Sequence, residues 1–393
     1  MSNSLKIYLI AGEPSGDALG ARLMRAMKAK MKDNVEFFGI GGENMEAEGL
    51  HSLFDISDLA VMGLAEVIPS IPKVLRRIHE TVNDIIKIHP DIVVSIDSWS
   101  FGSRVQKIIR QKKLGIPQLH YVAPQVWAWK KKRARIMHKY VDHLLTLLPQ
   151  EAKYFIPYGM QTTFVGHPVI ESPVATGNKE SFRHKYNIAD NKKIICILPG
   201  SRHNEVAKLL PTFLNAARQL AKQHSDLLFV IPTVKTVEKR VLQMTNNCDL
   251  PLLIVEGSED RHNAMCASSA AIAASGTVAL ELAIANVPHI IGYKVSPLTA
   301  FLAKHLLHIR FVNLSNILLG REIIPELLQN ACNPDNICNY INGFLSHDKL
   351  YHTQISAFKE VKQILGFDKQ TPSENACDVI LQLIYNSNNK TPE

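Results

Sequence analysis

Short apolar runs alternate with stretches of helical spacing along the first part of the chain. Runs typical of buried strands occupy 6–11, 91–97, 116–122, 143–148 and 162–166. Between them, apolar residues recur every three or four positions, which predicts helices near 17–31, 67–88 and 102–112. This alternation predicts a parallel sheet with helices on both of its faces.

The pattern stops at 167–192, a segment rich in Pro, Gly and polar residues that we interpret as a linker. A second series follows, with a helix over 205–223 and strand-like runs at 193–198, 227–232, 251–255, 270–275 and 287–293. After residue 345 the pattern is helical, with breaks at Gly366 and Pro372. We therefore expect an α/β fold with two doubly wound Rossmann-like domains, 1–170 and 171–345, and a helical tail over 346–393.

The turns that follow the strands are the candidates for ligand binding, because doubly wound sheets bind ligands beyond the carboxyl ends of their strands. In the second domain, Gly200 and Ser201 turn from a strand into a helix, and Arg202 adds a charged fork. A similar Ser-Gly-Thr turn occupies 275–277. Small residues let a phosphate approach the backbone N–H groups at a helix start. Two such turns in one domain predict a diphosphate ligand.

Glu281 lies about one turn inside the helix that follows the second of these turns. Its carboxylate could accept hydrogen bonds from sugar hydroxyls at that position. Alternatively, it could only complement the positive end of the helix dipole. The residue pattern leaves both interpretations open.

The first domain has an acidic glycine turn, AGEPSGD at 11–17, and a second turn, DSWSF at 97–101. The acidic turn lacks the GK[ST] of a Walker loop and the spacing of a dinucleotide loop. Its acids, Glu13 and Asp17, suit a ligand with hydroxyl groups better than a bare phosphate. Asp97 directly follows an apolar run, where a carboxylate can serve as a general base or as the cap of the next helix.

Segment 123–140 combines Trp127 and Trp129 with a run of Lys and Arg residues. Such a sequence suits a lipid headgroup boundary, a phosphorylated ligand or a nucleic acid. A solvated basic helix face is the simpler interpretation. The whole chain has 44 Lys and Arg against 36 Asp and Glu, a net charge of +8. Because this excess is modest, a non-enzymatic membrane- or nucleic-acid-binding protein is disfavoured, and we expect no nucleic-acid partner.

The six cysteines include no CxxC pair, and several lie in apolar runs, which indicates a reducing compartment without a zinc site or a disulfide frame. No stretch reaches the ~18 uninterrupted apolar residues of a membrane span. The N-terminus has no basic region before its short apolar run. The chain also lacks DxD and HExxH motifs. We therefore expect a cytoplasmic protein without a metal or cofactor, at most attached to a membrane surface.

Several motifs together resemble one family, the lipid A disaccharide synthases. The matching segments are AGEPSGD (11–17), GIGGENMEAEG (39–49), VMGLAEV (61–67), YVAPQVWAWKKKR (121–133), GHP (166–168), LPGSRHNEV (198–206), ASGTVALELA (274–283) and NILLGREIIPELLQ (316–329). The resemblance spans nearly the whole chain, and PQVWAW and GEPSGD are far more specific than a glycine loop. It implies a GT-B glycosyltransferase whose two Rossmann-like domains face a cleft.

The resemblance further implies an inverting, metal-independent transfer that joins UDP-2,3-diacylglucosamine to 2,3-diacylglucosamine 1-phosphate (lipid X). The products would be the β-1,6-linked tetraacyl lipid A disaccharide 1-phosphate and UDP. The enzyme would be peripheral on the cytoplasmic face of a Gram-negative inner membrane. Because some family members exchange C-terminal segments, the tail would either return to the first domain or be exchanged in a homodimer.

The resemblance also assigns residues to the two substrates. The donor UDP would lie on the second domain, at Gly200, Ser201, Arg202, Glu205, Ser275, Gly276, Thr277, Glu281, Asn316 and Gln329. The acceptor would lie on the first domain, at Glu13, Ser15, Gly16, Asp17, Lys130 and Arg133, with its acyl chains on the apolar segment 61–78. We expect Asp97 to be the base that takes the proton of the acceptor 6-hydroxyl, with Glu13 and His120 as alternatives.

The chain departs from the family pattern at two places. The family commonly has Asp-x-Pro-Asp-Phe at 97–101, but Trp99 replaces the proline here and Ser100 replaces the second acid, which removes any role that needs two carboxylates. Lys130 stands where Arg is usual, so the phosphate grip there should be weaker. A UDP-N-acetylglucosamine 2-epimerase on the same scaffold is the alternative function; it would need neither acyl pockets nor PQVWAW.

Overall fold

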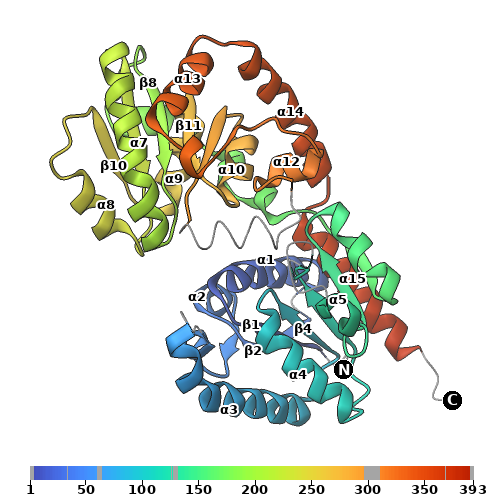
Figure 1. Cartoon of the computed structure of the whole chain (residues 1–393). Helices are drawn as coiled ribbons and strands as arrows, with labels where there is room; N and C mark the ends of the chain where they lie inside the picture. The colour runs from blue at the N-terminus through green and yellow to red at the C-terminus, as the bar shows by residue number, and fades with distance from the viewer. Residues whose placement is uncertain are drawn as a thin grey trace. The chain divides into compact units, whose positions relative to one another are not determined.

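The computed structural model describes residues 4–32, 34–59, 64–124, 126, 132–295, 310–367 and 369–389, of which 64–70, 132 and 388 are described by their backbone alone. The chain forms two compact units (Figure 1). Unit 1 comprises Met1–Pro168 and Lys369–Glu393, and unit 2 comprises Val169–Asp368. The segment expected as a separate tail is therefore divided: α14 (Lys349–Leu365) lies in unit 2 and α15 (Pro372–Asn388) lies in unit 1.

Unit 1 is built on a seven-stranded sheet with the order β3-β2-β1-β4-β5-β6-β7, in which every pairing is parallel. The strands are β1 (Leu5–Ala11), β2 (Val35–Ile40), β3 (His51–Ser52), β4 (Ile92–Ile96), β5 (Gln118–Tyr121), β6 (His143–Thr146) and β7 (Gln161–Phe164). The helices are α1 (Pro14–Met31), α2 (Glu43–Ala47), α3 (Leu64–Ile88), α4 (Trp99–Gln111), α5 (Lys132–Met137) and α15. The expected parallel sheet is thus confirmed in this unit.

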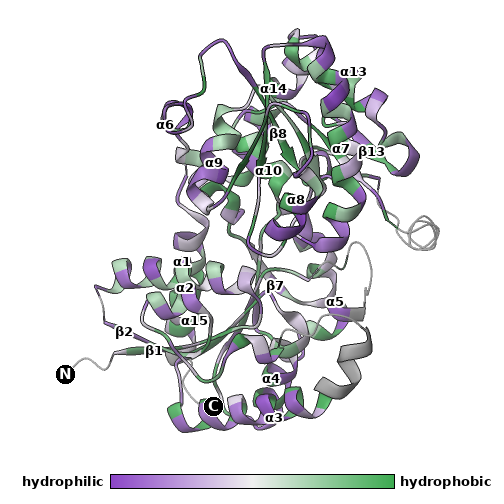
Figure 2. Cartoon of the chain, turned by 90° about the vertical axis from the view of Figure 1, so that its left-hand side faces the viewer, coloured by the Kyte–Doolittle hydropathy of each residue, from purple (hydrophilic) through white to green (hydrophobic). Residues whose placement is uncertain are grey.

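Side chains of β1 alternate between two apolar cores, as the period of a strand requires. Ile7 and Leu9 pack with residues of α1 and α15, whereas Tyr8 and Ile10 pack with residues of α3 and α4. Figure 2 shows the strands of both units as the most hydrophobic segments, with helices that carry polar residues around them. The C-terminal helix α15 therefore completes a core that begins with the first strand of the chain.

Unit 2 has a six-stranded parallel sheet with the order β10-β9-β8-β11-β12-β13. Its strands are β8 (Lys193–Leu198), β9 (Leu227–Pro232), β10 (Leu252–Val255), β11 (Ala270–Ala274), β12 (His289–Tyr293) and β13 (Glu326–Leu328). Its helices include α6 (Lys179–Lys185), α7 (His203–Gln223), α8 (Glu238–Thr245), α9 (Ser258–Ala267), α10 (Val278–Ile284), α12 (Leu314–Leu319), α13 (Pro334–Leu345) and α14. Residues of α7 and α13 pack on one face of the sheet, and residues of α6 and α9 pack on the other.

The interpretation of 167–192 as a linker is wrong in part. Its second half forms α6, which begins at the N-cap Asn178, whose side chain accepts a 2.8 Å hydrogen bond from the Ser181 amide. Phe182 is buried in the core beside Ile194. A helix this short gives a weak periodic signal, so its polar residues dominated the pattern.

The strand order reverses between β1 and β4 in unit 1, and between β8 and β11 in unit 2. Such a switch point leaves a crevice at the carboxyl ends of the two strands, where doubly wound proteins bind ligands. Ala11 pairs with Ile96 at the first switch point, and Leu198 pairs with Ala273 at the second. The turns singled out in the sequence begin directly after these residues.

Candidate active site

Asp97 lies at the switch point of unit 1, immediately after β4. Its amide donates a 2.8 Å hydrogen bond to the Tyr121 carbonyl of β5, and its φ of 58° is in the left-handed region. The Ser15 hydroxyl donates a 2.6 Å hydrogen bond to Oδ2 of Asp97. Within the described part of the chain, Oδ1 of Asp97 accepts no hydrogen bond. The carboxylate is thus oriented through one oxygen, and the other is available to a substrate.

Two glycines bring the start of α1 close to the end of β4. A Cβ on Gly16 would lie 3.1 Å from the Ile96 carbonyl oxygen, and one on Gly12 would lie 3.0 Å from Oγ of Ser98. Because little space remains for a side chain at either position, both residues favour glycine. The predicted acidic turn and the predicted Asp97 turn are therefore brought together.

Asp17, which we expected to meet the acceptor, is instead used by the fold. Its side chain is buried and accepts hydrogen bonds from the amides of Gly42, Asn44 and Met45 at 2.8–3.0 Å, and from Nδ2 of Asn44 at 2.8 Å. These donors form the first turn of α2, which Asp17 caps from a neighbouring element. We therefore assign Asp17 to the fold, where its charge is satisfied by four donors.

Glu13 and Ser15 remain on the surface of the turn. Glu13 is the N-cap residue of α1, but its side chain makes no capping hydrogen bond, and it is exposed. Pro14 occupies the first position of the helix, where its missing N–H costs little. The acidic turn thus contains one carboxylate for the fold and one, Glu13, on the solvent side.

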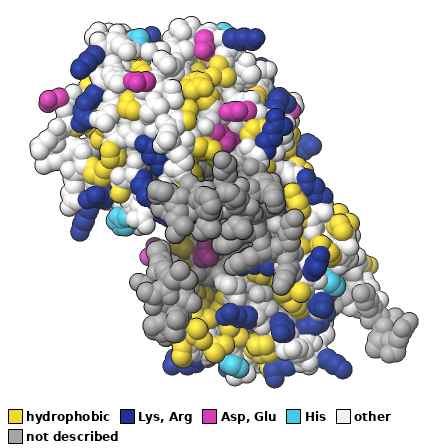
Figure 3. All heavy atoms as spheres, viewed as in Figure 1, with side chains coloured by type: hydrophobic (Ala, Val, Ile, Leu, Met, Phe, Trp, Pro, Cys, Tyr) yellow, Lys and Arg dark blue, Asp and Glu magenta, His cyan; other side chains and the backbone are white. Residues whose placement is uncertain are grey.

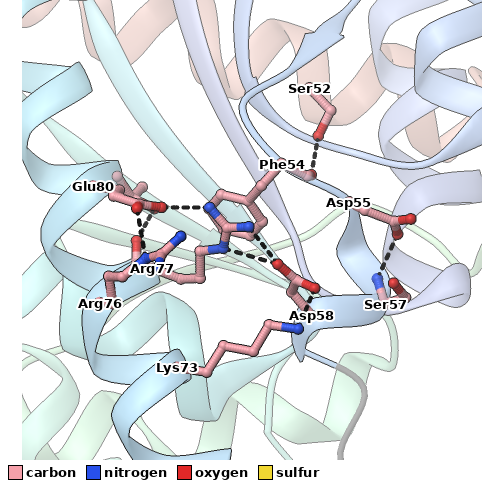
Figure 4. A network of polar contacts seen from close by, with 10 residues as sticks. Ser52, Phe54, Asp55, Ser57, Asp58, Lys73, Arg76, Arg77 and Glu80 are labelled. Atoms are coloured by element: carbon pink, nitrogen blue, oxygen red, sulfur yellow. Dashed lines mark hydrogen bonds and ion pairs between the residues drawn. The ribbon is translucent and has the colours of Figure 1, made fainter.

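A network of ion pairs holds the loop beside this turn (Figure 4). Arg77 of α3 contacts Asp58 at 2.5 Å and Glu80 at 2.6 Å, and Lys73 contacts Asp58 at 2.5 Å. The Arg77 guanidinium also lies over the Phe54 ring, 4.5 Å from its centroid. The adjoining Leu59 approaches Gly12, where a Cβ would lie 3.3 Å from its Cδ1. The network therefore links α3 to one wall of the acidic turn.

His120, the alternative base, is contradicted by its surroundings. It is fully buried in β5, and its Nδ1 lies 2.6 Å from Oγ of Ser95. Burial lowers the pKa of His120 to about 3. Trp99 packs edge-on against its ring, with centroids 5.0 Å apart, and also stacks on Tyr140. The unusual Trp99 is thus explained by packing, while Ser100 is exposed.

The aromatic and basic segment is described only in part. Lys130, Trp127 and Trp129 lie outside the described residues. Arg133 is partly buried at the second position of α5, and burial lowers its pKa from the usual value. On the face shown in Figure 3, Lys and Arg side chains are spread over the surface instead of forming one continuous basic patch.

In unit 2, the turn after β8 is closed by Glu205. One carboxylate oxygen of Glu205 accepts hydrogen bonds from the amides of Ser201 and Arg202 at 3.2 and 3.4 Å, and the other accepts from Arg202 Nη1 at 2.8 Å. Gly200 has a φ of 113°, and a Cβ there would lie 2.5 Å from Oε2 of Glu205. Glu205 therefore shapes this turn from inside, while the Arg202 side chain is 80% exposed above it.

The second turn of unit 2, residues 275–277, directly follows β11, which pairs with β8 at the switch point. Oγ of Ser275 donates a 3.1 Å hydrogen bond to the Val312 carbonyl, while Gly276 and Thr277 are exposed. Glu326 fixes the loop that carries Val312, because its carboxylate accepts from the Val312 and Asn313 amides at 2.9 Å each. Glu326 was not expected at the site, although the motif segment 316–329 contains it together with Gln329.

Asn316, expected at the donor, is also used by the fold. It is fully buried, its Oδ1 accepts from the amides of Ile323 and Ile324, and its Nδ2 donates to the Ile324 carbonyl and to Glu326. All four contacts are 2.8–3.0 Å long. An amide with this many partners supports the Glu326 loop and has no capacity left for a ligand.

Glu281 pairs with a residue that no sequence motif indicated. Arg261 of α9 forms an ion pair with Oε2 of Glu281, and His262 Nε2 lies 3.8 Å from Oε1. The Glu281 side chain is largely buried on α10, so the helix-dipole interpretation alone does not describe it. Twenty residues separate the partners, and spacing gave no signal for their contact.

Gln329 follows β13 in a left-handed conformation with a φ of 52°. Its Oε1 accepts a 3.4 Å hydrogen bond from the amide of Val295, two residues beyond the end of β12. It therefore lies at the same edge of the sheet as the two glycine turns.

Among the described residues, no group of three His, Cys, Asp or Glu side chains is arranged to hold a metal ion. None of the described helices is both long and apolar enough to cross a membrane.

Comparison with known proteins agrees with this arrangement of motifs. The family model described as lipid-A-disaccharide synthetase matches residues 7–380. The chain belongs to the lipid-A-disaccharide synthase family. A lipid-A-disaccharide synthase of Paramagnetospirillum magneticum is 46% identical over 380 residues, covering 96% of this chain and 97% of that protein. Another, from Rhodospirillum centenum, is 44% identical over 380 residues, covering 97% of this chain and 95% of that protein. The resemblance seen in the motifs is confirmed.

A solved structure confirms the expected fold class. The UDP-GlcNAc 2-epimerase of Neisseria meningitidis, bound to UDP-GlcNAc, superposes with a TM-score of 0.64 over 97% of this chain and 100% of that chain. The sequences are only 13% identical, so this likeness shows the GT-B type fold of two Rossmann-like units. It does not favour the epimerase as the function, whereas the synthase family identifies a glycosyltransferase.

Proposed function

We propose that this member of the family joins UDP-2,3-diacylglucosamine to 2,3-diacylglucosamine 1-phosphate (lipid X). The products are the β-1,6-linked tetraacyl disaccharide 1-phosphate and UDP. The observation that carries this proposal is the family match over residues 7–380. The position of Asp97 and of the two glycine turns at the switch points of their sheets supports it.

The donor would be held by unit 2. The turn at 275–277 offers backbone N–H groups to the diphosphate. At 200–202 a phosphate would take over the Ser201 and Arg202 amides from Glu205, and α7 adds the positive end of its dipole. Arg202, mostly exposed and fixed at one side by Glu205, would swing its guanidinium onto the phosphates. Glu281 would meet the ribose hydroxyls. Gln329 would meet the sugar at the same edge of the sheet.

The acceptor sugar would be held by unit 1. Glu13 and Ser15 are exposed on the acidic turn. Glu13 offers a carboxylate and Ser15 a hydroxyl group for hydrogen bonds with the hydroxyl groups of the sugar. Gly16 lets the sugar approach the start of α1. Arg133, together with Lys130, would bind the 1-phosphate. Asp17 is excluded from these contacts because the fold uses its whole carboxylate.

Asp97 would act as the general base. In an in-line displacement, the acceptor 6-oxygen forms a bond to the anomeric carbon of the donor while the bond from that carbon to the UDP oxygen breaks. Oδ1 of Asp97 takes the hydroxyl proton as the new bond forms. UDP leaves with the electron pair of the broken bond, and Arg202 and the N–H groups of the two turns stabilise its charge. One attack of this kind inverts the anomeric centre.

Attachment to the cytoplasmic face of a membrane is part of the same proposal. Ile71 and Leu75 of α3 are 47% and 45% exposed and lie one turn apart. Lys73 and Arg76 flank them on the same stretch. An apolar strip edged by basic residues suits an interface with anionic lipid, from which lipid substrates would arrive.

Exchange of α15 between two copies would give a homodimer. Measurement of the molecular mass of the protein in solution would test this arrangement.

The test is UDP release from UDP-2,3-diacylglucosamine in detergent, with and without lipid X, and in the presence and absence of excess EDTA. The proposal predicts release only when lipid X is present, and the same rate with and without EDTA. Release without an acceptor, or conversion of UDP-GlcNAc to its 2-epimer, would contradict it. A strict requirement for a divalent ion would keep the transfer and overturn its metal independence.

A further inference from the structure

Four neighbouring strands of unit 2 end in one row of residues. Ala273 is paired with Leu198, Ala274 with Gly292, and Tyr293 with Leu328. Continuing this register by one residue past β11 places Gly200, Ser275, Tyr293 and Leu328 side by side across β8, β11, β12 and β13. With strands ~4.8 Å apart, Leu328 lies about 10 Å from Ser275. The row therefore starts at the two proposed phosphate turns and leads away from them.

The far half of the row is apolar and exposed. Tyr293 and Leu328 are 36% and 39% exposed, whereas the preceding residues Gly292 and Leu327 are buried. Each of these two strands therefore ends in a large apolar side chain that the described residues leave partly uncovered. Tyr293 and Leu328 are register partners on neighbouring strands, so both side chains project from the same face of the sheet.

The neighbouring residues show which face this is. A Cβ on Gly292 would lie 2.7 Å from the Phe213 ring of α7, and Lys294 Nζ donates a 2.8 Å hydrogen bond to Thr212 of α7. Leu327 packs in the core that contains α7. Because side chains alternate along a strand, Tyr293 and Leu328 point away from α7. They share that side with Glu326, whose carboxylate fixes the Val312 loop beside Ser275.

We propose that Tyr293 and Leu328 form the contact surface for an acyl chain of the donor sugar. This inference rests on the proposed function and extends it from the nucleotide to the lipid part of the donor. A diphosphate on the Gly200 and Ser275 turns places its hexose over the next strand of the row. The acyl substituents of that hexose then reach the exposed Tyr293 and Leu328 side chains. The pair makes the enzyme selective for UDP-sugars with long acyl chains over those with short ones.

The experiment compares two donors that differ only in acyl length, with lipid X as acceptor and the full chain in detergent. One is UDP-2,3-diacylglucosamine with long chains, and the other carries two acetyl groups. Leu328→Ser should lower kcat/KM for the long-chain donor about 5-fold, because a half-covered leucine loses part of its contact area. The same variant should leave kcat/KM for the diacetyl donor and the Kd for UDP unchanged.

Leu242→Ser is the matched control, since Leu242 lies on α8 and is 42% exposed, but outside the row. It should behave as wild type with both donors. Tyr293→Phe should also retain long-chain selectivity, and Tyr293→Ser should lose it. If Leu328→Ser folds poorly by circular dichroism, Leu328→Ala is compared in its place. An unchanged preference between the donors, or an equal loss on both, would overturn the inference. Absence of disaccharide with the wild-type chain would overturn the proposed function itself.

Discussion

The Ser15 hydroxyl donates a 2.6 Å hydrogen bond to Oδ2 of Asp97 and so joins the first turn of α1 to the carboxyl end of β4. The two residues are 82 positions apart in the chain. One belongs to the acidic glycine turn and the other to the turn expected to carry the base. Their contact brings a serine and an aspartate from two separate motifs into one candidate site.

Asp97→Asn keeps the shape of the side chain and an acceptor for Ser15, but removes the proton acceptor. We expect kcat to fall by roughly 10²–10⁴-fold, the usual contribution of general base catalysis. The rate of disaccharide formation at saturating substrates measures this, with circular dichroism to confirm the fold. Activity within threefold of wild type would assign the base to another group, such as Glu13.

Ser15→Ala removes the hydrogen bond that orients Asp97. A single hydrogen bond of this kind contributes about 1 kcal/mol, so kcat should fall roughly 3- to 10-fold. Ser100→Ala is the matched control, because Ser100 is an exposed serine of the adjacent turn without this contact. Equal effects of the two substitutions on kcat would show that Ser15 does not orient the base.

Asp17→Ala should act on stability instead of on the acceptor. It leaves the amides of Gly42, Asn44 and Met45 without their buried partner. Each unsatisfied buried group costs ~1–3 kcal/mol, so the free energy of unfolding should fall by about 3 kcal/mol or more. Urea unfolding of unit 1 measures the loss. A stable variant with a raised KM for lipid X would instead place Asp17 in the acceptor site.

Arg202→Ala should weaken UDP binding with little effect on folding. A charge-assisted hydrogen bond contributes ~1.5–3 kcal/mol, which corresponds to roughly a 10- to 100-fold rise in Kd. Because the side chain is 80% exposed, its pair with Glu205 adds little stability. Titration calorimetry with UDP measures the Kd, and Arg240→Ala, at an exposed arginine of α8, is the control. Equal affinities of the two variants for UDP would remove Arg202 from the donor site.

Glu151 should make the stability of unit 1 depend on pH. Burial raises its pKa from 4.5 to about 7, although its carboxylate accepts hydrogen bonds from the Leu147 and Leu148 amides. Between these two values the folded chain holds a proton that the unfolded chain releases, so stability falls as pH rises. Glu151→Gln removes this loss, which is of order 1–3 kcal/mol from pH 4.5 to 7. Urea unfolding at pH 5 and pH 8 measures it, and parallel curves for variant and wild type would contradict the assignment.

The sheets were predictable because parallel strands buried on both faces give continuous apolar runs, as in 193–198 and 270–274. Short edge elements such as β3 and β13 gave no such run. The glycine turns were predictable as well, since positions such as Gly200 require a conformation that other residues rarely adopt.

The division of polar residues between fold and ligand was not predictable. Asp17 and Glu13 stand four positions apart in one motif, yet Asp17 is buried against α2 and Glu13 is exposed. Asn316 likewise belongs to a matched motif but is saturated by backbone groups. The partners that decide these roles come from distant segments, as Arg261 does for Glu281. Their contacts arise only from the packing of whole elements.

The most direct test of the account is the identity of the product made from UDP-2,3-diacylglucosamine and lipid X. Mass spectrometry should find a tetraacyl disaccharide monophosphate in amounts equal to the UDP released, and proton NMR should show a β-linkage to the 6-oxygen. The same incubation with Asp97→Asn should yield almost none. Release of UDP without this disaccharide, or a product with an α-linkage, would contradict the inverting transfer.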